Sequence, residues 1–240
     1  MTLLLANSLF DGFVKSNGIG QAIVVLQICG SIAMVAAIIG KWQELEYANR
    51  ATRRFLHDFA AGRDVLEYYL NRRPTCKTGL EGIYRETCER LLKLLSPDAR
   101  SGLYGRSGAE PATAALTNHE IQLVRGTCEH ALDEEELRVE HGMGVIATVV
   151  ALAPMLGLLG TVWGVLDAFH EMDTGVDLAM IAPSISSALL TTVVGLLIAI
   201  PGVIAYNHMN STIRRLTSDM EGFSDELIGR VACEFQGRSV

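Results

Sequence analysis

Four hydroxyl side chains in two long apolar stretches are the residues best placed to do chemistry. Thr161 lies in the first stretch, and Ser187, Thr191 and Thr192 lie in the second. At about 100° per residue, Ser187 and Thr191 share one helix face, and Thr192 lies about 80° from it. A hydroxyl in an apolar environment can hydrogen-bond a neighbouring helix, a chain of water molecules or an ion. These residues therefore predict either a helix interface or an ion path lined by neutral oxygens.

Small residues accompany the hydroxyls on the same helix faces. They recur every three or four positions, which allows two helix backbones to approach closely in a membrane. One such stripe is ordinary packing material in a membrane bundle. Two stripes on consecutive helices favour a lined interface or pore. The residues expected to serve in helix packing are Pro154, Gly157, Gly160, Gly164, Ser184 and Gly195.

Asp167 is the only charged residue inside the apolar stretches, and it lies near the end of one of them. The acidic residues Glu171, Asp173 and Asp177 follow it in the next turn. Charged groups are costly in lipid and usually functional. Asp167 therefore either belongs to an acidic outer mouth that concentrates cations, or simply marks the edge of the membrane.

The motifs of the common enzyme classes are absent from the sequence. There is no P-loop, no GxSxG, no HExxH and no dinucleotide fingerprint. The five cysteines form no Cys-x-x-Cys pair, and Cys128, His130 and His141 do not have zinc-site spacing. A net charge of -7 without a basic patch argues against nucleic acid binding. We expect no enzyme activity, cofactor or metal site, and any transport to draw on an ion gradient.

Three apolar runs reach the roughly 20 residues that a helix needs to cross a bilayer. Fifteen of the 20 Lys and Arg residues lie in 41–140 and four in 207–240, whereas the turn at 170–177 has none. Short basic flanks stay in the cytoplasm, so the N-terminus is expected outside and the C-terminus inside. The runs are roughly 19–39, 145–169 and 178–206.

The predicted fold class is all-α: an integral membrane protein with three transmembrane helices and long helices extending into the cytoplasm. The expected segments are an external N-terminal segment (1–18), a first transmembrane helix (19–40), a cytoplasmic helical region (41–142), a domain at 143–225 with transmembrane helices at about 145–169 and 178–206, and a cytoplasmic C-terminal tail (226–240).

Within the cytoplasmic region, apolar residues at helical spacing predict further helices. They cover Lys41–Arg73, Thr78–Leu95 and Ala112–Glu140, and a loop rich in Gly, Ser and Pro covers Ser96–Pro111. The acidic run at 133–136 is interpreted as a solvent-exposed helix face.

Two segments resemble the MotA/TolQ/ExbB proton channel family, in its TolQ/ExbB branch. Residues 152–169 (LAPMLGLLGTVWGVLDAF) are similar to the second membrane helix of that branch. Residues 181–207 (IAPSISSALLTTVVGLLIAIPGVIAYN) are similar to the third. Three spans with an outer N-terminus fit this branch, because flagellar stator proteins of the MotA type have four.

The resemblance implies an ion-conducting energiser subunit of a Tol/Ton-type motor in the bacterial inner membrane, driven by the proton-motive force. It also implies a homo-oligomeric ring, a pentamer in the family, around a smaller TolR/ExbD-like partner with an intramembrane Asp. A TolA/TonB-like protein would carry force toward the outer envelope. The threonines that line the family's ion path correspond to Thr161 and Thr192. Both a TolQ-like and an ExbB-like role remain open, and the short outer N-terminus favours TolQ.

One position departs from the family pattern. The third helix of the family usually carries a Glu in the pattern APGIAEAL, whereas residues 182–189 read APSISSAL and place Ser187 there. The chain thus offers no titratable group at mid-membrane. Either the partner's carboxylate handles H⁺, or the coupling ion is Na⁺, which suits neutral oxygens. A non-conducting membrane scaffold is the third alternative.

Overall fold

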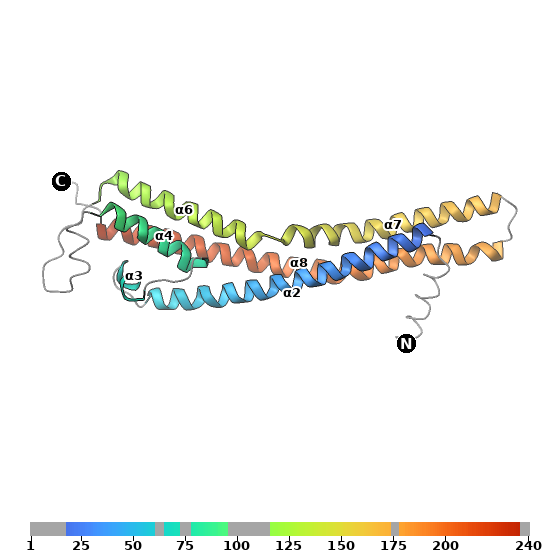
Figure 1. Cartoon of the computed structure of the whole chain (residues 1–240), viewed down its shortest axis with the longest axis horizontal. Helices are drawn as coiled ribbons and strands as arrows, with labels where there is room; N and C mark the ends of the chain where they lie inside the picture. Colours follow the sequence, from blue (N-terminus) through green and yellow to red (C-terminus); the bar gives the residue numbers. More distant parts are fainter. Residues whose placement is uncertain (1–17, 61–64, 73–77, 96–115, 174–177, 236–240) are drawn as a thin grey trace. The chain divides into compact units, whose positions relative to one another are not determined.

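The computed structural model describes residues 18–60, 65–72, 78–95, 116–173 and 178–235, and these residues form helices without a β-strand. The all-helical prediction is therefore confirmed for the described residues. The predicted loop at 96–111 and the external segment before residue 18 lie outside them. The helices are α2 (Gly18–Ala60), α3 (Glu67–Arg72), α4 (Gly79–Leu94), α6 (Asn118–Glu140), α7 (Met143–Asp173) and α8 (Leu178–Phe235) (Figure 1).

Three helical stretches are long and apolar enough to cross a membrane, judged by length and composition. They lie in Gly18–Ala60, Asn118–His170 and Ser184–Phe235. The prediction of three membrane-spanning helices is thereby confirmed at the level of helix length and hydropathy.

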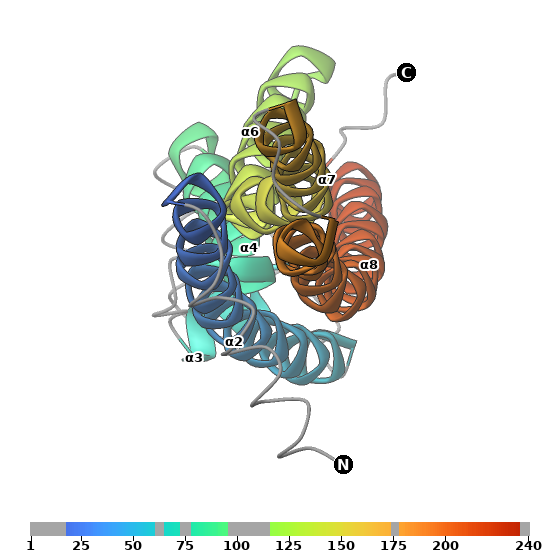
Figure 2. The same ribbon diagram turned by 90° about the vertical axis from the view of Figure 1, so that its right-hand side faces the viewer.

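The chain divides into two compact units. One comprises 1–42 with 142–210, and we call it the apolar unit; the other comprises 43–141 with 211–240, and we call it the charged unit. The helices α2 and α8 contribute residues to both. Within the apolar unit, α2, α7 and α8 run alongside one another (Figure 1), and Figure 2 shows them end on.

The helix predicted after the first apolar run differs from the one in the structure. One helix through Lys41–Arg73 is wrong. Residues 41–60 continue the first apolar run in the helix α2, which ends at Ala60, and Glu67–Arg72 form the separate helix α3. The helix α6 ends at Glu140, as predicted, and the helical structure is interrupted before α7 at Gly142, whose φ of +85° is a backbone conformation that favours glycine. The hydropathy of α2 changes at Gly40 without ending the helix, so composition marks a boundary where the backbone has none.

An aromatic cluster forms the core of the charged unit. The Tyr84 ring of α4 lies 5.6 Å from both Phe55 and Phe59 of α2, and Phe223 of α8 lies 5.1 Å from Phe59. The Tyr84 hydroxyl donates to the carbonyl oxygen of Val65 at 2.6 Å. Burial raises the pKa of the Tyr84 phenol, so it stays a protonated donor across the physiological range. The cluster ties α2, α4 and α8 together.

Apolar residues at helical spacing are buried on two helices of this unit. Buried residues are Leu80, Ile83, Tyr84 and Leu91 of α4, Leu95 just after it, and Ile213, Leu216 and Met220 of α8. In α4, Leu92 is only half-buried.

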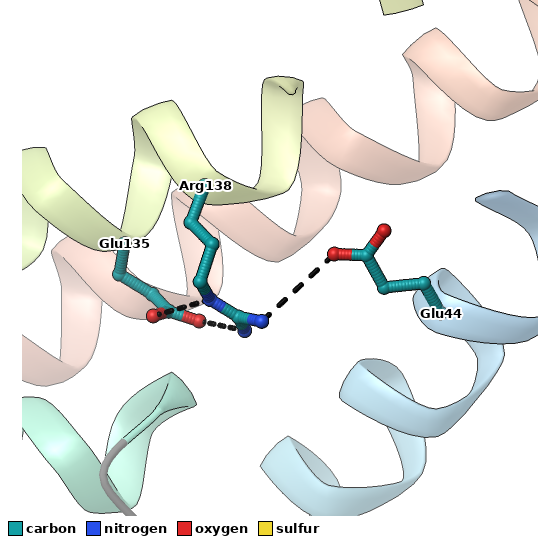
Figure 3. Close-up of polar contacts among 3 residues, drawn as sticks. All are labelled: Glu44, Glu135 and Arg138. Carbon is teal, nitrogen blue, oxygen red and sulfur yellow. Dashed lines mark hydrogen bonds and ion pairs between the residues drawn. The ribbon is translucent and has the colours of Figure 1, made fainter. Parts of the chain in front are cut away.

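The acidic run at 133–136 is not uniformly a solvent-exposed face. Asp133 and Glu134 are exposed, but the Glu135 side chain is only 8% exposed and pairs with Arg138 on the next turn of α6. The Arg138 Nε lies 2.9 Å from a Glu135 oxygen, and its Nη1 lies 3.8 Å from Glu44 of α2. Figure 3 shows the guanidinium between the two carboxylates. The interpretation of Glu135 as solvent-exposed is wrong, because the sequence does not reveal which residue of an acidic run faces another helix.

Replacing Arg138 with Met is expected to destabilise the charged unit by about 1–3 kcal/mol, because it leaves the buried Glu135 carboxylate without its ion pair. The measurement is the thermal unfolding midpoint of the purified protein. The matched control is Arg50→Met, which removes an exposed pair with Glu46 at 2.9 Å. Exposed ion pairs four residues apart on a helix contribute only about 0.3–0.5 kcal/mol. Equal midpoints for the two variants would contradict a stabilising role for Arg138.

Candidate functional site

Glycines bring α7 and α8 into backbone contact in the apolar unit. A Cβ on Gly157 would lie 2.8 Å from the Thr192 Cα, and one on Gly160 or Gly164 would overlap Thr191 or Ala188. On the other helix, a Cβ on Gly195 would lie 2.5 Å from the carbonyl oxygen of Ala153. All of these distances are shorter than real Cβ contacts, so this spacing of the two helices depends on glycine.

Two adjacent threonines of α8 reach across this contact to one carbonyl of α7. The hydroxyl of Thr192 donates to the Gly157 oxygen at 2.9 Å. The hydroxyl of Thr191 lies 3.1 Å from the same oxygen and 2.7 Å from that of Ala188, and its one proton can go to either. The offset of Thr192 from the Ser187–Thr191 face therefore does not separate the two threonines at this contact. Thr191 is 2% exposed, whereas Thr192 is only half-buried.

The other two hydroxyls predicted for the site bond within their own helices. Thr161 donates to the carbonyl of Leu158 at 2.7 Å, and Ser187 donates to that of Ser184 at 2.9 Å. Ser187 is 7% exposed, and Thr161 is half-buried. The structure thus joins Thr191 and Thr192 at one atom, while Thr161 and Ser187 each lie about one turn away along their helices. Every one of these protons goes to a backbone carbonyl, so the hydroxyl lone pairs remain the free acceptors.

The remaining predicted positions lie along the same helices. Pro154 is half-buried inside α7, where its missing N–H removes one helical hydrogen bond. Ser184 is half-buried in α8, and Asp167 is half-buried in the last two turns of α7. Of the acidic residues after Asp167, Asp177 lies outside the described residues.

Gln27 of α2 is a site residue that sequence reasoning missed. It is 2% exposed, and its Nε2 donates to the carbonyls of Ala153 at 3.2 Å and Thr191 at 3.3 Å. The signal in the sequence was an uncharged amide well inside the first apolar run, and a search for ionisable groups passes over it. Gln27 brings the third helix of the unit to the contact between α7 and α8.

No group of three or more potential metal ligands occurs among the described residues. Cys128, which sequence inspection weighed as a ligand, is buried with its Sγ 2.9 Å from the hydroxyl of Ser224. Burial raises the pKa of the Cys128 thiol, so it behaves as a packing residue. The described site is a contact of three apolar helices with neutral oxygens and amides at its centre.

Comparisons with known proteins identify relatives of this chain. The profile of the MotA/TolQ/ExbB proton channel family matches residues 103–222. A Tol-Pal system protein TolQ from Haemophilus influenzae is 32% identical over 222 residues, which are 90% of each chain. A TolQ from Pseudomonas aeruginosa is 29% identical over 87% of this chain and 88% of its own. A biopolymer transport protein ExbB from Neisseria gonorrhoeae is 32% identical over 52% of this chain and 56% of its own.

The family match spans α6, α7 and most of α8, and it includes every predicted position of the contact between α7 and α8. Together with the TolQ match along most of the chain, it confirms the resemblance seen in the two apolar segments. The chain belongs to the MotA/TolQ/ExbB proton channel family.

Proposed function

We propose that this chain is the ion-conducting energiser subunit of a Tol/Ton-type motor in the bacterial inner membrane, with its N-terminus outside and its C-terminus in the cytoplasm. The motor couples ion flow to work on the cell envelope or to outer-membrane transport. The observation that carries the proposal is the glycine-lined contact at which Thr191 and Thr192 meet the Gly157 carbonyl. Family membership and the three apolar helices support it.

Exposure divides the four hydroxyl residues into two roles. Thr161 and Thr192 are half-buried, so a partner helix or an ion can reach them from outside the chain's own packing. Thr191 and Ser187 are buried within the single chain. We assign the lining of the ion path to Thr161 and Thr192, and we assign Thr191 and Ser187 to the support of that surface. Asp167 would belong to the outer mouth.

The apolar surface of α7 supports assembly into a ring. Its exposed apolar side chains form one broad face of about 140° at 100° per residue, on which Leu158, Leu159, Val162 and Trp163 are each at least 42% exposed. Apolar surface on this scale needs lipid or protein against it. A homo-oligomer, a pentamer by family expectation, places further copies of the chain against part of it.

The mobile charge would come from a second chain. The described residues between Ile181 and Tyr206 of α8 include no ionisable side chain other than Tyr206 itself. A TolR/ExbD-like single-span partner with a membrane Asp would bring the carboxylate, and a TolA/TonB-like protein would transmit the force. The two TolQ matches cover 90% and 87% of the chain, whereas ExbB relatives cover 36% to 64% of it, and this supports the TolQ-like assignment.

Neutralising the partner's carboxylate tests this proposal. The chain is reconstituted in lipid vesicles with its partner, or with a partner whose membrane Asp is replaced by Asn. H⁺ entry is followed with a pH-sensitive dye in the lumen, and Na⁺ entry with radioactive Na⁺. We expect H⁺ flux with the native partner and a loss of at least about tenfold with the Asn variant. Equal flux with both partners would contradict a partner-supplied charge. Flux of Na⁺ in place of H⁺ would identify the sodium-driven form.

A further inference from the structure

Gln27 contacts both other helices of the apolar unit through one amide group. Its Nε2 lies within hydrogen-bond distance of the carbonyl oxygens of Ala153 in α7 and Thr191 in α8. These contacts fix the orientation of the amide, because two carbonyl oxygens can accept hydrogen bonds only from its NH₂ end.

The carbonyl end of the Gln27 amide lacks a corresponding hydrogen-bond donor among the described residues. Its Oε1 is buried and has no hydrogen-bond partner among the residues that the structure describes. Leaving a buried acceptor unpaired is unfavourable, and hydrogen bonds between membrane helices are individually weak. The two bonds from Nε2 therefore roughly offset the unpaired Oε1, so Gln27 contributes little net stability. A half-paired polar group of this kind calls for an explanation other than stability.

The glycines of the contact leave the space that Gln27 occupies. A Cβ on Gly195 would lie 3.0 Å from Nε2, and one on Gly157 would lie 3.5 Å from it. Gly157 is also the residue whose carbonyl accepts the hydroxyl proton of Thr192. The amide thus lies where the half-buried threonine of α8 is attached to α7.

We propose that Gln27 is a positioning residue for the ion path. Its amide holds Ala153 of α7 and Thr191 of α8 at one level, and this keeps the Thr192 hydroxyl on the Gly157 carbonyl. It acts through the backbone of α7 and α8, and it does not itself need to touch the ion. The inference rests on the proposed conduction, and it adds α2 to a site otherwise made by α7 and α8.

The test is Gln27→Met in the full complex with the partner, because Met keeps the length of the side chain and removes the amide. The matched control is Gln21→Met, the same change at a half-buried position of the same helix. We expect Gln27→Met to lower ion flux at least about tenfold, with an unchanged or higher thermal unfolding midpoint. We expect Gln21→Met to keep native flux.

Either of two results overturns the inference: native flux in Gln27→Met, or a lower midpoint that accompanies the loss of flux, since the latter marks a merely structural role. A second readout needs no flux. If Gln27 positions α8, backbone amide hydrogen exchange at 188–196 should be faster in Gln27→Met than in the native chain, and unchanged exchange would refute the positioning role. Absence of flux in the native complex would instead refute the proposed function, and the exchange comparison would still decide the role of Gln27.

Discussion

Replacing Thr192 with Val is expected to reduce ion flux at least about fivefold, with the oligomer and its partner still assembled. Valine has nearly the shape of threonine, so the packing of α8 is kept while the hydroxyl is lost. The loss removes the 2.9 Å bond to the Gly157 carbonyl and the oxygen that an ion could meet at this half-buried position. Losing a hydrogen-bond partner costs about 1–3 kcal/mol. If that cost falls on the barrier to ion passage, the rate changes by roughly five- to a hundredfold. The measurement is flux in vesicles, with assembly checked by size-exclusion chromatography.

The matched control for Thr192→Val is Thr148→Val. Thr148 lies on α7, is exposed, and donates its hydroxyl proton to the Gly144 carbonyl at 2.7 Å. It thus makes the same kind of intrahelical bond as Thr161 without lying at the contact between α7 and α8. Native flux in Thr148→Val and reduced flux in Thr192→Val would assign the effect to the site. Native flux in both would contradict the assignment of Thr192 to the ion path.

Gly195→Val is expected to abolish flux and to destabilise the apolar unit by about 1–3 kcal/mol, the usual cost of overpacking. The added Cβ would lie 2.5 Å from the carbonyl oxygen of Ala153, which is a backbone atom and cannot rotate away. It would also lie 3.0 Å from Nε2 of Gln27. The helices α7 and α8 must therefore separate, which pulls the threonine hydroxyls away from Gly157. Flux and the thermal midpoint of the purified complex measure the two effects.

Gly222→Val, on the same helix, separates this steric effect from the effect of valine on helix formation. A Cβ on Gly222 has no atom within 4 Å. The control should keep the native free energy of unfolding to within about 1 kcal/mol, because only intrinsic helix propensity changes. If both variants lose the same stability, close approach at Gly195 is not the cause.

Hydropathy and periodicity predicted much of this fold. Three long apolar runs required membrane-length helices, and the stripe from Leu80 to Leu95 required a buried face on α4; the structure has both. These features are local, because apolar spacing along a helix determines which side can be buried. The glycine positions were likewise visible in the sequence, since small residues recur at helical spacing.

The features that the sequence did not reveal all depend on contacts between distant segments. Gln27 and Thr191 are separated by 164 positions, and no local pattern links them. Glu135 looks like its acidic neighbours until α6 packs against the rest of the charged unit. The hydroxyls of Thr191 and Thr192 lie on different faces by helical period, yet both reach Gly157 because glycine lets the backbones come so close.

The central claim is that this chain, with a partner carboxylate, forms a path for ions across the membrane. The most direct test is flux into vesicles that hold the native chain, with and without the TolR/ExbD-like partner, under an imposed H⁺ or Na⁺ gradient. We predict H⁺ entry that requires both chains and that Thr192→Val reduces. If neither ion enters vesicles that hold the intact complex, under any gradient, the result contradicts conduction and favours a membrane scaffold.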